Sequence, residues 1–138
     1  MINRIYYKKG YKYQLIKPYS IQTDIIPPKD IVSSGGFIML DRTGMLHIKH
    51  GYAWDGASCA IDSTTFMRGS LIHDALYGLM REGILYTSYR SQADDLLGSI
   101  CRYDGMSKLR AWYVVWMVKL FAQPASDPKN CKPILYAP

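Results

Sequence analysis

The chain has 138 residues, a formal net charge of +6 and three cysteines. A chain of this length can bury a hydrophobic core of its own, so residues 1–138 are expected to form one domain. The cysteines are widely spaced and form no CxxC pair, which argues against a disulfide framework or a cysteine zinc site. The positive charge permits an acidic partner, although solvated lysines are its commoner cause.

No targeting or membrane-spanning segment is expected. The N-terminal segment MINRIYYKKGYKYQ lacks the continuous apolar stretch of a signal peptide. A membrane-spanning helix needs about 18 apolar residues. The longest apolar run, from Ala111 to Val118, is much shorter.

The first part of the chain, residues 1–52, is predicted to be mainly β-structure. Its short apolar segments are separated by residues that favour turns, a pattern typical of β-hairpins. The predicted strands cover residues 5–7, 11–16, 21–26, 37–40 and 45–49. The following segment, residues 53–65, is predicted to be a loop.

Residues 66–123 are predicted to be helical, and the tail 124–138 is predicted to be irregular. Apolar residues recur at helical spacing, and Gly83, Gly105 and Pro124 mark the helix ends. The predicted helices cover residues 66–81, about 87–103 and 107–123. Strands followed by helices indicate an α+β fold, in which N-terminal β-hairpins or a small antiparallel sheet precede a three-helix C-terminal half.

The third predicted helix, SKLRAWYVVWMVKLFAQ, is apolar on nearly every face. Such a helix is either central to the core or partly covered by a partner or a membrane surface. We favour the central position from the sequence. Aromatic residues left exposed would instead favour assembly or binding at an interface.

The stretch RGSLIHDALYG, residues 68–78, places His73 beside Asp74 on the first predicted helix. On a helical wheel, His73 lies at the edge of the apolar arc, with Ser70 and Tyr77 as neighbours on the same side. Asp74 lies about 100° further round and is expected to point away from the core.

Asp94 lies at the edge of the apolar arc of the second helix, whereas Asp95 points away from it. A carboxylate at this edge needs a partner, and His73 occupies the equivalent edge of the neighbouring helix. The sequence therefore predicts a His73–Asp94 pair. A carboxylate bonded to one imidazole nitrogen leaves the other nitrogen free to act as a base. Alternatively, the pair only ties two helices together.

The segment GYAWDGAS, residues 51–58, is a candidate ligand loop. Its run Gly56-Ala57-Ser58 is small enough for a close approach of the backbone to a ligand. Loop carbonyls together with the Asp74 carboxylate would suit a hard cation such as calcium. The alternative is an ordinary connection in which Asp55 or Ser58 caps the following helix.

Four segments, taken in order, resemble a phage and prophage family known as domain of unknown function 1353. They are YAWDGAS (52–58), R.S..HDALY (68–77), R.QAD..L (90–97) and GM near 105, and the resemblance covers about residues 36–121. Cys59-Ala60 stand where that family usually has a proline. The resemblance implies a location in a virion or in the host cytoplasm, and it implies no particular reaction.

A more distant similarity is to the phospholipases A-two. It implies that His73 is the base that activates water and that Asp94 orients it. The calcium ligands that it implies are Asp74, Trp54, Gly56 and Ser58. The residues expected to contact the substrate are Tyr77, Ser70 and Trp54. The chain lacks the glycine-dense calcium loop and the disulfides of the secreted enzymes.

The first functional interpretation is a phage-encoded hydrolase that uses His73 and Asp94 on an envelope component, either a lipid ester or peptidoglycan, during entry or lysis. The alternatives are a non-enzymatic virion component of tail, baseplate or capsid, and a host-takeover binding protein. The expected partners are viral particle proteins, further copies of the chain, a membrane surface or the cell wall. Nucleic acid is not expected, because no recognised motif accompanies the basic, aromatic segment IYYKKGYKYQLIK.

Overall fold

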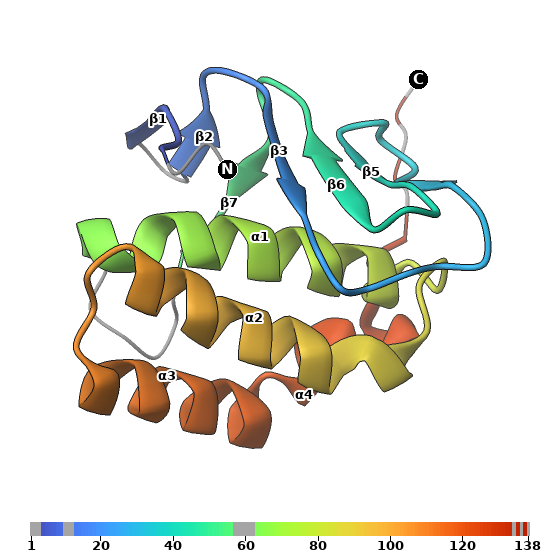
Figure 1. The fold of residues 1–138 in the computed structure, drawn as a ribbon. Helices are drawn as coiled ribbons and strands as arrows, with labels where there is room; N and C mark the ends of the chain where they lie inside the picture. Colours follow the sequence, from blue (N-terminus) through green and yellow to red (C-terminus); the bar gives the residue numbers. More distant parts are fainter. Residues whose placement is uncertain (1–3, 10–12, 57–62, 134, 136, 138) are drawn as a thin grey trace.

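The computed structural model describes residues 4–9, 13–56, 63–133, 135 and 137. Two small antiparallel sheets are followed by a helical C-terminal half (Figure 1). The fold is therefore α+β, as the order of strands and helices predicts. No helix among the described residues is both long and apolar enough to cross a membrane.

The strands form a three-stranded and a four-stranded sheet. The first has the order β1 (Tyr7–Lys9), β2 (Tyr13–Leu15), β7 (Ala53–Trp54), and the second has the order β3 (Tyr19–Gln22), β6 (Met45–Ile48), β5 (Ile38–Leu40), β4 (Ile31–Val32). The antiparallel pairs β1–β2 and β5–β6 each join strands that follow one another in the chain, which agrees with the hairpin pattern of the sequence. Side chains alternate between buried and exposed along β3, which is expected of a sheet with one face on a core.

The helical half contains α1 (Thr64–Arg81), η1 (Thr87–Tyr89), α2 (Arg90–Tyr103), α3 (Lys108–Phe121), α4 (Gln123–Ser126) and η2 (Pro128–Asn130). Ser107 caps α3 by accepting a hydrogen bond from the Arg110 amide. Two predicted boundaries are wrong. The segment 53–65 contains strand β7 and the start of α1, and the tail 124–138 contains the helical turns α4 and η2.

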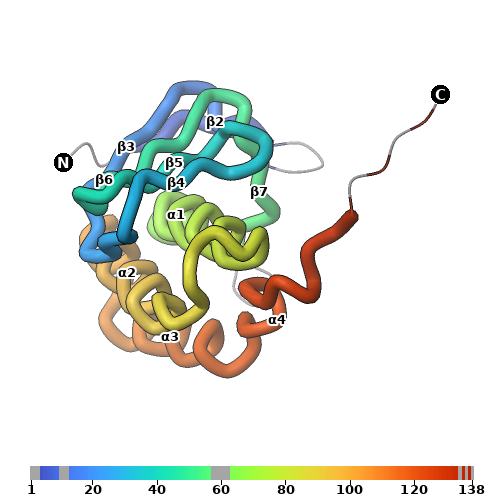
Figure 2. Tube along the Cα trace, turned by 90° about the vertical axis from the view of Figure 1, so that its right-hand side faces the viewer, coloured from blue at the N-terminus to red at the C-terminus, as the bar shows by residue number. Residues whose placement is uncertain are grey.

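Helix α1 is the central helix of the fold. The sheets cover one side of it, α2 packs along another, and α4 lies against it as well (Figures 1 and 2). By contrast, α3 lies on the outside, and its buried residues are Ala111 and Val114. The favoured prediction of a central third helix is therefore wrong, because α1 is the helix enclosed by the sheets and the other helices.

Two glycines let the helices approach closely. A Cβ atom at Gly69 of α1 would lie 2.9 Å from Leu97 Cδ1, and one at Gly98 of α2 would lie 2.5 Å from Val115 Cγ2. Both separations are shorter than ordinary van der Waals contact, so a side chain at either position would push the helices apart. Gly69 therefore allows α1 to lie close to α2, and Gly98 allows α2 to lie close to α3.

Candidate functional site

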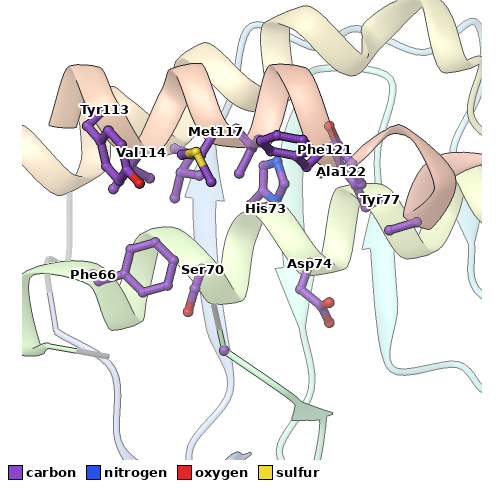
Figure 3. A pocket seen from close by; sticks show the side chains of 14 residues that line it. Phe66, Ser70, His73, Asp74, Tyr77, Tyr113, Val114, Met117, Phe121 and Ala122 are labelled. Carbon is purple, nitrogen blue, oxygen red and sulfur yellow. The ribbon is translucent and has the colours of Figure 1, made fainter. Parts of the chain in front are cut away.

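A cavity of about 140 Å³ lies beside α1, between this helix and α3 (Figure 3). Helix α1 lines it with polar and aromatic side chains, namely Phe66, Ser70, His73, Asp74 and Tyr77. Helix α3 supplies a mainly apolar wall, namely Tyr113, Val114, Met117, Val118 and Phe121. The cavity therefore joins one group of polar side chains to one apolar wall.

His73 and Asp94 form the hydrogen-bonded pair that the helical wheels predict. Nε2 of His73 lies 2.7 Å from Oδ1 of Asp94, which confirms the predicted contact. The His73 side chain is 12% exposed and that of Asp94 is 1% exposed. Because an ionised carboxylate only accepts hydrogen bonds, Nε2 carries the hydrogen in this pair. Nδ1 is then the nitrogen with a lone pair, and the described residues provide no hydrogen bond to it.

Tyr77 and Arg90 extend the pair into a longer polar chain. The Tyr77 hydroxyl donates to the same oxygen, Oδ1 of Asp94, over 2.6 Å, and accepts from Nε of Arg90 over 3.1 Å. Burial raises the pKa of Tyr77, and the hydrogen bond to Asp94 raises it further, so the phenol stays protonated and donates. The Tyr77 ring also lies against the His73 ring, with centroids 4.1 Å apart.

The two carboxylate oxygens of Asp94 differ in their hydrogen bonds. Oδ2 is buried and accepts no hydrogen bond within the described part of the chain. Its nearest cationic group is Nε of Arg90, 4.0 Å away. The carboxylate therefore directs its hydrogen bonds through one oxygen, toward His73 and Tyr77.

Asp74 also lines the cavity, but its side chain leaves α1 in a different direction from His73 (Figure 3). Its Oδ2 accepts a hydrogen bond from the Tyr52 hydroxyl over 2.5 Å. Burial raises the pKa of Asp74, while the Tyr52 hydrogen bond and the charge of Arg81 oppose this. The helical wheel predicts that Asp74 points away from the core. This expectation is corrected, because Tyr52 covers this side of α1 and bonds to the Asp74 carboxylate.

Ser70 and Trp54 are bonded to each other. The Ser70 hydroxyl donates to the Met67 carbonyl over 2.8 Å and accepts from the Trp54 indole nitrogen over 3.0 Å. Ser70 lines the cavity, but its only hydrogen is already engaged. The Trp54 side chain is 1% exposed and does not line the cavity. The expected contact between this ring and a substrate is therefore corrected, because the ring instead donates its hydrogen bond to Ser70.

The predicted calcium ligands lie partly at the cavity. Asp74 and Gly56 both line it, and the negative charge of Asp55 adds to the cost of ionising Asp74, a cost that a cation would offset. Ser58 lies outside the described residues. Among the described residues, no group of three or more histidine, cysteine or acidic side chains could hold a metal. Calcium takes six to eight oxygen ligands in proteins, so water and backbone oxygens would have to supply most of them here.

The sequence interpretation missed two residues of this site. Tyr52 lies in the candidate ligand loop, residues 51–58, but its sequence context gave no indication that it contacts Asp74. Arg90 lies four residues before Asp94 on the same helix, and this spacing indicates that the two side chains are neighbours. The α3 wall was also missed, since a helix that is apolar all round gives no indication of which face lines a cavity.

No family model, curated protein or solved structure matches the chain.

Proposed function

We propose that the protein is a hydrolase in which His73 acts as a general base and Asp94 orients it. The hydrogen bond of 2.7 Å between Nε2 of His73 and Oδ1 of Asp94, at the wall of a cavity, is the observation that supports this most. Two features add to it. Tyr77 fixes the same carboxylate oxygen, and Nδ1 of His73 has no partner among the described residues.

The proposed reaction follows from this arrangement. Nδ1 of His73 takes a proton from a water molecule as the water oxygen attacks the carbonyl carbon of an ester. The negative charge of Asp94 stabilises the imidazolium that forms. The imidazolium then returns the proton to the leaving alkoxide, so that one ester and one water give one carboxylic acid and one alcohol.

The cavity favours a lipid ester over peptidoglycan as the substrate. Its α3 wall consists of aromatic and aliphatic side chains, among them Met117 and Phe121. An acyl chain can pack against such a wall, and its burial is favourable in proportion to the apolar area removed from water. Peptidoglycan is a polar polymer, and its hydroxyl and amide groups would lose hydrogen bonds to water there. A role in phage entry or lysis rests on the family resemblance alone.

Calcium is an optional part of this proposal. Asp74 and Gly56 would hold the ion, which when bound would supply positive charge beside the ester carbonyl. The residues of the chain carry out the proton transfers without it. Its binding has a readout that is independent of activity, because a ligand that binds only the folded state raises the melting temperature. We expect calcium to raise the melting temperature of the wild type and not that of Asp74→Asn.

A second candidate function is a non-enzymatic virion component. The observation that favours it is the exposure of large apolar residues on α3, such as Leu109 and Trp112, since exposed apolar patches often mark protein contacts. In that case the His73–Asp94 pair would only tie α1 to α2. For this candidate we therefore expect the wild-type protein to hydrolyse neither phospholipid nor peptidoglycan, although the His73–Asp94 hydrogen bond is present.

The test is hydrolysis of phospholipid vesicles and of purified peptidoglycan, each with and without calcium. We expect acyl-chain release from phospholipid by the wild type and at least a hundredfold loss in His73→Ala, since general base catalysis contributes about 10²–10⁴-fold. His50→Ala is the matched control, because His50 is exposed and lies outside the cavity. Equal rates for wild type and His73→Ala would rule out the proposed base. A folded wild type with no activity on either substrate would favour the virion component.

A further inference from the structure

Helix α3 carries a face of large apolar side chains that the rest of the chain leaves uncovered. This α3 face consists of Leu109, Trp112, Tyr113, Trp116, Leu120 and Phe121. The exposed fraction is 77% for Leu109 and 62% for Trp112. Exposed apolar residues scattered singly need no explanation, but a contiguous patch on one helix marks a contact surface.

The spacing of four of these residues places them on one side of the helix. Leu109, Trp112, Trp116 and Leu120 follow one another at intervals of three or four residues, so they lie along one stripe. The Trp112 and Trp116 rings stack with centroids 6.4 Å apart. The opposite side of α3 packs on the core through Ala111 and Val114. This stripe is thus separate from the packing side of α3.

Charge favours an anionic surface as the partner of this face. Residues 108–123 contain the basic residues Lys108, Arg110 and Lys119 and no aspartate or glutamate, and Lys119 pairs with Asp95 of α2 over 3.1 Å. The whole chain has a formal net charge of +6. A second copy of α3 would bring like charges together, which is unfavourable. An anionic lipid headgroup layer complements these charges, and tryptophan and tyrosine are the side chains that favour the interface between lipid and water.

The α3 face is continuous with the cavity described above. Tyr113 and Phe121 are exposed on this face and also line the cavity that His73 lines (Figure 3). A surface that covers the aromatic side chains of α3 therefore lies next to the cavity. Lipid molecules in that surface would be adjacent to the proposed base.

We propose that the α3 face docks on the surface of an anionic lipid bilayer, with its aromatic side chains in the headgroup region and its basic residues against the phosphates. Lipid binding itself rests on the α3 face alone. Only the statement that docking presents a substrate to His73 rests on the proposed function.

The test measures binding to vesicles of ether-linked phospholipids, which contain no carboxylic ester bond for the proposed reaction to hydrolyse. One vesicle type contains phosphatidylglycerol and the other contains phosphatidylcholine alone. We expect the wild type to co-sediment with the anionic vesicles at least tenfold more tightly, and its tryptophan fluorescence to shift to shorter wavelength. Trp54 is buried, so this shift would report on Trp112 and Trp116.

Two variants and a control decide the outcome. The double variant Trp112→Ser/Trp116→Ser and the charge variant Lys108→Glu are each expected to bind at least tenfold more weakly while keeping the melting temperature of the folded protein. The control Tyr86→Ser removes an aromatic residue that is 69% exposed and is not part of the α3 face, because it lies between α1 and η1, and it should bind as the wild type does. Wild-type binding that is absent, or unchanged in both variants, would overturn the proposal. A concentration-dependent dimer that the double variant abolishes, without vesicle binding, would also overturn it.

Failure of the proposed function gives a different result. Vesicle binding that depends on the α3 face, with no hydrolysis of any ester by the wild type, leaves the docking surface in place and removes the enzyme. Hydrolysis of a soluble short-chain ester that requires His73, with vesicle binding unaffected by the two α3 variants, removes the docking surface and leaves the enzyme. If both proposals hold, the double variant loses activity on ester-linked vesicles and keeps it on the soluble ester.

Discussion

Nε of Arg90 donates a hydrogen bond to the Tyr77 hydroxyl over 3.1 Å and thereby connects the His73–Asp94 pair to α3. The other end of the same guanidinium donates to the backbone carbonyls of Val118 and Lys119 near the end of α3. One side chain at the start of α2 therefore bridges the residue that fixes Asp94 and the helix that forms the apolar wall of the cavity.

Replacement of Arg90 tests this bridge. Lysine keeps the charge but lacks the planar fork that reaches both Tyr77 and the α3 carbonyls. We expect Arg90→Lys to lower the free energy of unfolding by about 1–3 kcal/mol, the range for losing hydrogen bonds of a charged group. We also expect kcat to fall by roughly tenfold, because Tyr77 loses its donor and holds Asp94 less firmly. Denaturant unfolding and ester hydrolysis measure the two effects.

Arg102→Lys is the matched control for this change. Arg102 donates to the Met106 carbonyl at the other end of α2 and does not contact the His73–Asp94 pair. Its replacement should leave kcat unchanged. A loss of kcat in both variants would show that activity follows general stability and not the bridge from Arg90 to Tyr77.

The charge of Asp94 can be removed with its shape kept. In Asp94→Asn, the amide oxygen can still accept from His73 and Tyr77, but the imidazolium loses its negative partner. We expect kcat to fall by about 10²–10⁴-fold. The new amide hydrogens take the place of Oδ2, which accepts no hydrogen bond within the described residues, so we also expect a loss of stability of about 1–3 kcal/mol.

Asp95→Asn separates the charge at this site from charge on α2 in general. Asp95 is 66% exposed and pairs with Lys119 over 3.1 Å. Exposed ion pairs contribute about 0–1 kcal/mol, so both stability and kcat should stay close to the wild type. If Asp94→Asn kept wild-type kcat as Asp95→Asn does, the pair would be structural.

The substitution Gly98→Ala tests the close approach of α2 to α3. Helix propensity alone predicts that Gly98→Ala stabilises α2 by about 1 kcal/mol. The added Cβ would lie 2.5 Å from Val115 Cγ2, however, and valine has little freedom to move aside. We therefore expect net destabilisation of about 1–3 kcal/mol by denaturant unfolding. The double variant Gly98→Ala/Val115→Ala removes the clashing methyl and should recover part of the loss. If the double variant were no more stable than Gly98→Ala, contact with Val115 would not be the cause of the destabilisation.

The sequence predicted the His73–Asp94 contact because both residues lie on long, strongly periodic helices, where a wheel fixes their directions. It could not predict the position of Asp74, since the wheel describes one helix and Tyr52 reaches this carboxylate from the segment beside strand β7. For the same reason the outer position of α3 was not predictable. Apolar residues on every face show that a helix is covered somewhere, but only the packing of the sheets and helices shows which side is covered.

The raised pKa of Asp74 predicts how stability depends on pH. Burial raises this pKa from its ordinary value of 3.8, so the folded state holds the proton more tightly than the unfolded state does. The folded state is therefore favoured below the ordinary pKa, and this contribution is lost as the pH rises through the folded pKa. Asp74→Asn resembles the protonated form at every pH. We expect this variant to be more stable than the wild type near pH 7, with the difference shrinking toward about pH 4.

Tyr52→Phe changes the same equilibrium in the opposite direction. The Tyr52 hydrogen bond lowers the pKa of Asp74, so its removal should raise that pKa further and make the loss of stability with rising pH steeper. Denaturant unfolding at several pH values between about 4 and 7 measures all three proteins. The comparison is complete when Tyr52→Phe is made in the Asp74→Asn background, where the extra pH dependence should disappear. A stability difference between wild type and Asp74→Asn that does not vary with pH would show that Asp74 is ionised at no cost in the folded state.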